Sequence, residues 1–273
     1  MTSESGALLE IRNLKKHFRV GGGMFGSMTG KKEYLKAVDG ISLSIEPGTT
    51  YGLVGESGCG KSTTAKMVLM LEEPTEGEIF FEGKDAINAD KTEKRHYRSS
   101  VQAVFQDPWA SLNPRMKIES IIAEPLEVNT TMTRGEIHAK VGEILEEVGL
   151  QQYQAELYPH EFSGGQRQRI SIARALATQP RLLVCDEPTS ALDVSIQAQI
   201  LNLLKDLQEQ LNLTILFISH DLPVIRQMCE RIAVLKNGKI CEVAATEELF
   251  IKPTHNYTKE LLNLMPKIES IYN

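Results

Sequence analysis

Apolar and polar positions alternate along the first fifty residues. "AVDGISLSIEPG" (37–48) places Ile41, Leu43 and Ile45 at every second position before Pro47-Gly48, and "LLEIRNL" (8–14) is similarly mixed. This pattern predicts antiparallel strands that bury one face. The stretch between them, "VGGGMFGSMTGKKEY" (20–34), is rich in glycine and lysine. It predicts a mobile surface loop.

Later apolar segments are short and lack alternation. They predict strands that are covered on both faces, as in a parallel sheet. These segments are "TTYGLVG" (49–55), "SSVQAVFQ" (99–106), "RLLVCDE" (181–187) and "TILFISH" (214–220). "GEIFFEG" (77–83) predicts an edge strand, and "RIAVLKNGKICEV" (231–243) predicts a hairpin in which Asn237-Gly238 forms a type I′ turn.

Helical periodicity separates these strands. Helices are predicted over "KSTTAKMVLML" (61–71), after "SGGQ", and over residues 195–211, where Ile200, Leu204, Leu207 and Leu211 share one side. Residues 133–150 predict a helix with Thr133 and Glu136 as a capping box and Gly149 as its stop. Its apolar face comprises Ile137, Val141, Ile144, Leu145 and Val148. The alternation of strands and helices predicts an α/β fold with a parallel sheet, flanked by antiparallel strands and interrupted by a helical insert over about 107–163.

Composition narrows the class of protein. The 273 residues are 41% apolar, enough for a buried core, and 30 basic against 36 acidic residues argue against nucleic acid as the main partner. The sequence shows neither a start typical of a signal peptide nor an apolar run of about 18 residues, so we expect a cytosolic protein that does not span a membrane. The scattered Cys59, Cys185, Cys229 and Cys241 predict reduced thiols, not a metal site or disulfides.

"GESGCGKS" fits the phosphate-loop pattern G-x-x-x-x-G-K-[ST] between a predicted strand and a predicted helix. Glycines let backbone N–H groups turn toward the β-phosphate, Lys61 reaches the β- and γ-oxygens, and Ser62 can bind Mg²⁺. Lys61 and the helix N-terminus are expected to favour the Cys59 thiolate, so that alkylation would obstruct nucleotide binding; the alternative is a buried, inert thiol. The predicted nucleotide contacts here are Gly55, Glu56, Ser57, Gly58, Cys59, Gly60, Lys61, Ser62 and Thr63.

"LLVCDEP" supplies carboxylates at the end of a buried strand. Asp186 suits an Mg²⁺-bound water beside the phosphate loop. Glu187, one residue further on, can polarise the attacking water as a general base.

Five motifs occur in a fixed order: the phosphate loop, "FSGGQRQR", "LLVCDEP", "SALD" and "ISH". With them the chain resembles the ATP-binding-cassette (ABC) ATPases along nearly its whole length, although Phe162 replaces the usual leucine of the LSGGQ signature. The resemblance implies a P-loop NTPase (RecA-like) core and a nucleotide-binding domain over residues 1–250. A helical subdomain is expected at about 107–165 and a short tail at 251–273. It also implies a head-to-tail dimer in which Ser163, Gly164, Gly165 and Gln166 cover the γ-phosphate of ATP bound by the other subunit.

The remaining roles come from the same resemblance. Gln106 resembles the glutamine that senses Mg²⁺ and γ-phosphate, so the implied Mg²⁺ ligands are Ser62, Gln106 and Asp186. His220 resembles the switch histidine that orients Glu187 and water, and Asp193 resembles the residue that joins the two sites across the dimer. Phe18 resembles the aromatic residue that stacks on adenine, with Val38 near the base and Tyr34 as a rival. Arg167, Arg169 and Arg174 fit a phosphate clamp or, preferably, a solvated or interface helix face.

Three stretches narrow the resemblance to the ATP-binding subunits of dipeptide, oligopeptide and nickel importers: "VFQDPWASLNPRM", "YPHEFSGGQRQR" and "KPTHNYTKELL". This implies an ATPase at the cytoplasmic face of the membrane that pairs with a second cassette, either itself or a paralogue. The helical insert would bind a membrane permease, and an extracytoplasmic solute-binding protein would deliver the substrate. Peptide import is the preferred reading; a nickel or metal-chelate importer, or a non-transport ABC ATPase of iron–sulfur assembly type, stays open. With no cysteine beyond Cys241, no iron–sulfur cluster is expected. A P-loop kinase would have no use for "SGGQ" or "SALD".

Overall fold

The computed structural model describes residues 6–20 and 33–264, which form two compact units. The first unit comprises Met1–Ile45, Thr50–Ile87 and Ile218–Asn273, and the second comprises Glu46–Thr49 and Asn88–Phe217. Most of the loop predicted between the first two strands lies outside the described residues.

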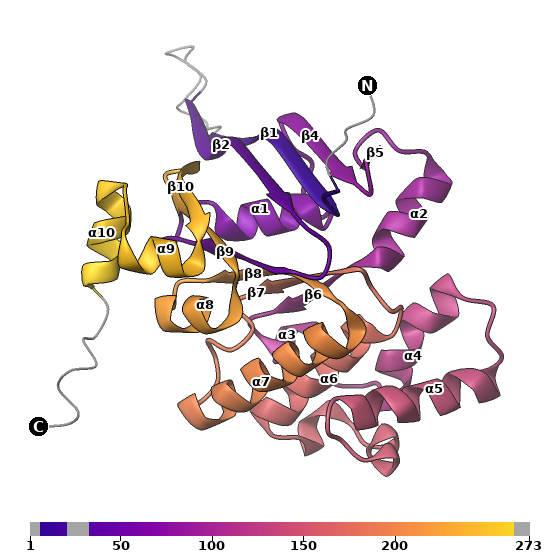
Figure 1. Cartoon of the computed structure of the whole chain (residues 1–273). Helices are drawn as coiled ribbons and strands as arrows, with labels where there is room; N and C mark the ends of the chain where they lie inside the picture. Colours follow the sequence, from indigo (N-terminus) through magenta and orange to yellow (C-terminus); the bar gives the residue numbers. More distant parts are fainter. Residues whose placement is uncertain (1–5, 21–32, 265–273) are drawn as a thin grey trace, which may run out of the picture. The chain divides into compact units, whose positions relative to one another are not determined.

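An antiparallel sheet of four strands belongs to the first unit (Figure 1). The apolar residues of its first strand, Leu9, Ile11 and Leu14, are buried. The predicted edge position of residues 77–83 is wrong, because a two-residue strand pairs with their outer side. The strands in sheet order are β2 (Glu33–Ile45), β1 (Leu9–Val20), β4 (Glu76–Phe81) and β5 (Lys84–Asp85).

The first unit also contains β3 (Thr50–Val54), which pairs in parallel with β9 (Arg231–Lys236). β10 (Lys239–Ala245) returns antiparallel to β9 through Asn237-Gly238, with φ angles of 48° and 77°. Positive φ at both central residues confirms the predicted type I′ hairpin. The helices of this unit are α1 (Lys61–Val68), α8 (Leu222–Met228), α9 (Thr246–Ile251) and α10 (Asn256–Asn263).

In the second unit, β6 (Val101–Phe105) and β7 (Leu182–Asp186) pair in parallel. β8 (Thr214–Ser219), whose last two residues belong to the first unit, follows β7 in the sheet order. The predicted parallel sheet is therefore confirmed, and every residue of β8 is buried as predicted. The residues that directly follow these strands are Gln106 after β6, Glu187 after β7 and His220 after β8, all three of them predicted site residues.

Helices dominate the second unit between its strands (Figure 1). The Thr133–Glu136 capping box is confirmed, all five residues of the predicted apolar face are buried, and Gly149 follows the helix with a φ of 74°. The elements are α2 (Lys91–Ser100), α3 (Pro108–Ser111), α4 (Ile118–Asn129), α5 (Arg134–Glu147), η2 (Gln152–Glu156), η3 (Pro159–Glu161), α6 (Gly164–Leu176) and α7 (Val194–Leu211).

Three helices differ from what the sequence pattern predicts. Helix α2 was not predicted, although Asp90 and Glu93 form a capping box at its start. Helix α1 stops three residues earlier than predicted, and Met70 just beyond it has a φ of 53°. On α7, three residues of the predicted apolar side are buried, whereas the fourth, Leu211 at the end of the helix, is 49% exposed.

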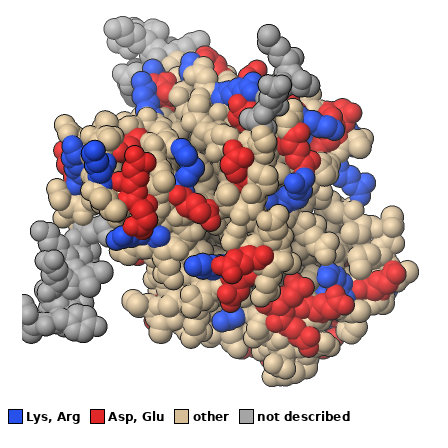
Figure 2. All heavy atoms as spheres, viewed as in Figure 1, with Lys and Arg blue, Asp and Glu red and all other residues tan. Residues whose placement is uncertain are grey.

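The surface in view carries both signs of charge. Figure 2 shows lysine and arginine intermixed with aspartate and glutamate, in line with the net charge of −6. Among residues 6–20 and 33–264, no helix is both long enough and apolar enough to cross a membrane.

Candidate nucleotide-binding and hydrolysis site

The phosphate loop lies between β3, whose five residues are all buried, and α1, which begins at Lys61. Gly60 caps this helix with a φ of 112°. A Cβ atom at Gly60 would lie 2.3 Å from the carbonyl oxygen of Ala37 on β2, so no larger residue fits there without a backbone shift. The glycine is therefore needed both for the left-handed turn and for the close approach of β2.

Lys61 is enclosed by its own loop. Its side chain is buried, and Nζ donates hydrogen bonds to the carbonyl oxygens of Gly55 at 2.6 Å and Glu56 at 3.0 Å. The ammonium group is thus held at the centre of the loop, where a phosphate-binding lysine has to be. Ser62 follows it in the first turn of α1.

Cys59 corrects one expectation. The residue is buried, and burial raises the pKa of its thiol even though the charge of Lys61 acts in the opposite direction. The predicted preference for the thiolate is therefore wrong, because desolvation of the anion outweighs the nearby ammonium group. The structure agrees with the alternative reading of a buried thiol.

The second unit brings Gln106, Asp186 and Glu187 to one sheet edge. In the parallel pair β6–β7, Phe105 is opposite Asp186. Gln106 and Glu187 come directly after these two residues, so both follow the carboxyl ends of neighbouring strands. This is the edge at which ligands bind in α/β sheets.

Glu187 has an unusual backbone. Its φ is 52°, a left-handed conformation that non-glycine residues adopt only when the surroundings impose it. The carbonyl oxygen of Glu187 accepts hydrogen bonds from the N–H (3.3 Å) and hydroxyl (3.1 Å) of Ser190. The chain therefore turns sharply at the residue predicted to be the general base.

Gln168 was missed in the sequence, where it is one of several polar residues in "SGGQRQR". It is completely buried on α6, and its Nε2 donates to the carbonyl oxygens of Phe105 at 3.3 Å and Pro188 at 2.7 Å. One side chain thereby connects the end of β6, the residue after Glu187 and the signature helix. The sequence alone gave no signal for this role, because it depends on the pairing of β6 with β7.

The signature motif forms the start of α6. The hydroxyl of Ser163 accepts a hydrogen bond from the Gln166 N–H, and the Gln166 carboxamide accepts one from the Ser163 N–H. A Cβ atom at Gly165 would lie 2.5 Å from Cγ2 of Ile196, so the glycine lets α6 approach α7 closely. The N-terminal N–H groups of α6, including that of Gly164, follow this cap, as suits an anion-binding helix end.

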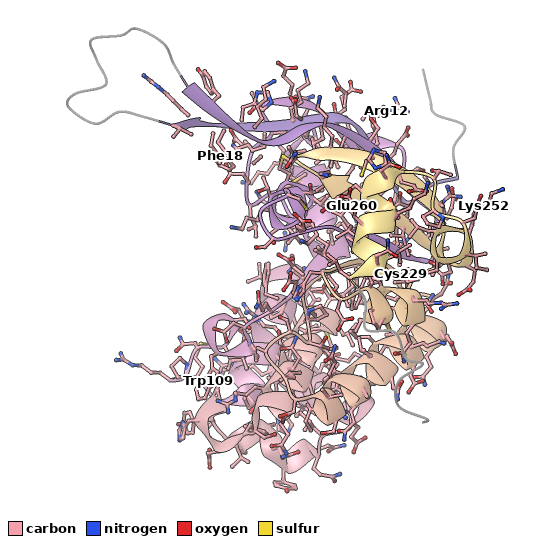
Figure 3. The ribbon with its side chains drawn as sticks, turned by 90° about the vertical axis from the view of Figure 1, so that its left-hand side faces the viewer. Arg12, Phe18, Trp109, Cys229, Lys252 and Glu260 are labelled. Atoms are coloured by element: carbon pink, nitrogen blue, oxygen red, sulfur yellow. The ribbon has the colours of Figure 1, made fainter. Side chains whose placement is uncertain are left out.

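The arginines of α6 bind within the second unit. Arg167 is buried, with Nε 3.3 Å from the Ser163 carbonyl oxygen and its guanidinium 3.5 Å from the ring centroid of Trp109 (Figure 3). Arg169 donates to the carbonyl oxygen of Val148 at 2.6 Å. Arg174 donates to the Ser111 carbonyl oxygen and forms an ion pair with Glu124. The solvated face is therefore wrong for the buried Arg167. The Arg174 side chain stays 39% exposed, so a solvated or interface face stays a prediction for the rest of this helix surface.

Two further predicted site residues follow strand or motif ends. His220 comes directly after β8 and is exposed, and it belongs to the first unit. Asp193 is the exposed N-cap residue of α7 in the second unit. The next residue, Val194, is 83% exposed, which is unusual for an apolar side chain.

The proposed adenine contacts lie on β1 and β2. Phe18 on β1 is half-buried, with the Lys16 ammonium 5.0 Å from its ring centroid (Figure 3). Tyr34 on β2 is 51% exposed and lies opposite Arg19, so both aromatic candidates occupy adjoining positions. Val38 is completely buried beneath the phosphate loop.

A strand, a glycine loop around a buried lysine and a helix define a P-loop nucleoside triphosphatase. The chain also matches the family model described as ABC transporter over residues 38–190. It is 50% identical to the oligopeptide transport ATP-binding protein AppF of Bacillus subtilis, over 95% of this chain and 78% of that protein. It is 47% identical to the dipeptide transport ATP-binding protein DppF of Haemophilus influenzae, over 97% and 80% respectively.

Solved structures of ABC proteins also have folds similar to that of this chain. A dimeric ATP-binding cassette in a post-hydrolysis state with ADP and Pi superimposes with a TM-score of 0.75 at 30% identity, covering 87% of this chain and 98% of that one. The chain cbiO1 from Clostridium perfringens, part of an ABC transporter complex, gives a TM-score of 0.76 at 26% identity, covering 91% and 92%. The chain belongs to the ABC transporter family, as an ATP-hydrolysing cassette of the kind that its motifs predicted.

Proposed function

We propose that this chain is the ATP-hydrolysing subunit of an importer for dipeptides or oligopeptides. The observation that carries the proposal is the identity of 47–50% to peptide-transport ATP-binding proteins over at least 95% of the chain. That similarity includes the helical segment as well as the phosphate loop. A fold alone would not support a substrate class, because one fold serves many functions.

The residues of the phosphate loop fit ATP. The Lys61 ammonium lies inside the loop, and the loop is closed too tightly at Gly60 for any side chain there. In the proposed site, Ser62, Gln106 and Asp186 supply oxygen ligands of the kind that Mg²⁺ prefers. The ion, when bound, would neutralise charge on the β- and γ-phosphates.

Within the proposed reaction, Glu187 accepts the proton of the attacking water and His220 orients the pair. Accepting that proton makes the water a stronger nucleophile toward the γ-phosphorus. Phe18, or alternatively Tyr34, stacks on adenine. The sharp turn at Glu187 and the Gln168 hydrogen bonds support a fixed position for the carboxylate.

The proposed partners follow from the same assignment. A second cassette, identical or paralogous, supplies Ser163–Gln166 to the ATP held by this chain, and Asp193 lies at the contact between the two. A permease at the cytoplasmic face of the membrane binds the helical segment at about 107–165. An extracytoplasmic solute-binding protein delivers the peptide to that permease.

The test is isolation of the intact complex from membranes, followed by transport in proteoliposomes with a labelled dipeptide and a labelled tetrapeptide. We expect a membrane-spanning partner to co-purify and ATP-dependent uptake to occur with the wild-type chain but not with Lys61→Ala. Uptake of a nickel chelate without peptide uptake would replace the proposed cargo. Purification without any membrane-spanning partner would contradict the importer assignment.

A further inference from the structure

The C-terminal helix of the first unit reaches the phosphate loop. Tyr257, in the first turn of α10, is only 3% exposed, and its hydroxyl oxygen accepts a hydrogen bond from the Glu56 N–H at 3.2 Å. Glu56 is the second residue of the loop. Burial raises the pKa of Tyr257 further above neutral pH, so the side chain stays a neutral hydroxyl at pH 7. A neutral tyrosine hydroxyl can accept the hydrogen bond from the Glu56 N–H.

A second contact from the same region supports the loop. The Gly238 N–H, in the β9–β10 turn, donates to the carbonyl oxygen of Cys59 at 2.9 Å. The ammonium group of Lys236, at the end of β9, lies 4.1 Å from the ring centroid of Tyr257. The phosphate loop is therefore held from outside, at Glu56 and at Cys59, by two segments that follow it by about 180 and 200 residues in the sequence.

The segment before Tyr257 is anchored to β10 by one buried carboxylate. Glu242 accepts hydrogen bonds from the N–H and the hydroxyl of Thr254, both at 2.7 Å, and from the His255 N–H at 3.0 Å. Burial alone would raise the pKa of Glu242, but hydrogen bonding from the Thr258 side chain, together with the bonds from Thr254 and His255, lowers it to about 2. His255 then accepts from the Tyr257 N–H through Nδ1 at 3.2 Å. An unbroken series of hydrogen bonds thus leads from β10 to the residue that touches the loop.

We propose that Tyr257 is a positioning residue for nucleotide binding, which holds the entrance of the phosphate loop in its binding conformation from the C-terminal segment. A glycine-rich loop loses much conformational freedom when it binds, and a contact that orders it beforehand lowers that cost. Tyr257 acts through the backbone of Glu56, whose N–H donates to the tyrosine hydroxyl. The inference rests on the proposed assignment of Gly55–Ser62 as the ATP phosphate site.

The test compares Tyr257→Phe with the wild-type chain. The change removes the hydroxyl and keeps the ring beside Lys236. We expect the Kd for a fluorescent ATP analogue, and the KM for ATP, to rise about 2- to 10-fold, the effect of losing one hydrogen bond. Because the contact persists in the ground state and in the transition state, kcat should stay nearly constant.

Glu242→Gln supplies an independent variant that acts through the same residue. It should also raise the Kd. The Kd of the double variant should rise little beyond the larger single effect, because both changes act on the same hydrogen bond between Glu56 and Tyr257. Two variants serve as controls and should leave the Kd unchanged. They are Tyr153→Phe, at a 70% exposed tyrosine of the second unit, and Glu260→Gln, at an exposed position of α10 (Figure 3).

An unchanged Kd and KM in Tyr257→Phe, whatever happens to its melting temperature, would overturn the proposal and leave the contact a purely structural one. Lys61→Ala is measured alongside. If that variant also bound the analogue normally, the assignment of the phosphate site itself would be at fault. If Lys61→Ala lost binding while Tyr257→Phe kept it, only the role of Tyr257 would fail.

Discussion

Gln168→Leu tests whether one buried carboxamide holds the hydrolysis edge of the second unit together. The change keeps the approximate length of the side chain and removes both hydrogen bonds, to the carbonyl oxygens of Phe105 and Pro188. Each bond contributes about 0.5–1.5 kcal/mol, and a buried carbonyl that loses its partner costs about 1–3 kcal/mol. Burial of the apolar leucine side chain at the same position offsets part of this loss of stability. We therefore expect a net loss of about 2–4 kcal/mol in the free energy of unfolding.

The assay is thermal and urea unfolding of the isolated chain, with ATPase activity measured at a temperature where the variant is fully folded. A loss of that size lowers Tm by about 4–12 °C in a domain of this size. Activity should fall as well, since the released carbonyl oxygens belong to Phe105, directly before Gln106, and to Pro188, directly after Glu187. The control is Gln199→Leu at an exposed position of α7, where both quantities should stay near wild type.

Two results would refute this reasoning. A loss of stability below about 0.5 kcal/mol, within the range of ordinary surface substitutions, would show that other groups satisfy the two carbonyl oxygens. Full activity in a variant that is clearly destabilised would show that Gln168 supports the fold without fixing the position of Glu187.

The strands of the parallel sheet could be predicted because burial on both faces leaves a direct record in the sequence. Leu182, Leu183, Val184 and Cys185 are continuous in the chain and are all buried in the structure. The start of the α5 helix was equally predictable, since the Thr133–Glu136 capping box is a local interaction over three residues. The phosphate loop is local in the same sense.

Contacts between distant segments could not be predicted in this way. The role of Gln168 depends on where β6 and β7 end relative to α6, and no local pattern encodes that position. The hydrogen bond between Tyr257 and Glu56 spans 201 residues. The pKa of Cys59 also depends on packing: the sequence shows the nearby Lys61, but it does not show the burial that outweighs the lysine charge.

The remaining predictions concern the reaction and its shared site. Glu187→Gln should bind MgATP normally but hydrolyse it at least about 10²-fold more slowly, because the general base is lost; turnover near wild type would exclude this role. Cys59 should react with iodoacetamide at pH 7 more slowly than a free thiol, since burial raises its pKa. Mass spectrometry of the labelled peptide measures this rate, and labelling as fast as that of a free thiol would contradict the prediction. In a mixed dimer of Lys61→Ala and Ser163→Arg chains, a signature that acts on its neighbour leaves one site with both lesions and the other with none. Because a charge-stabilising group supplied in trans can contribute about 10³–10⁵ in rate, the intact site should recover single-turnover hydrolysis that neither parent shows. If the signature served its own chain, every site would carry a lesion, so proven mixed dimers without recovery would exclude the proposed sharing.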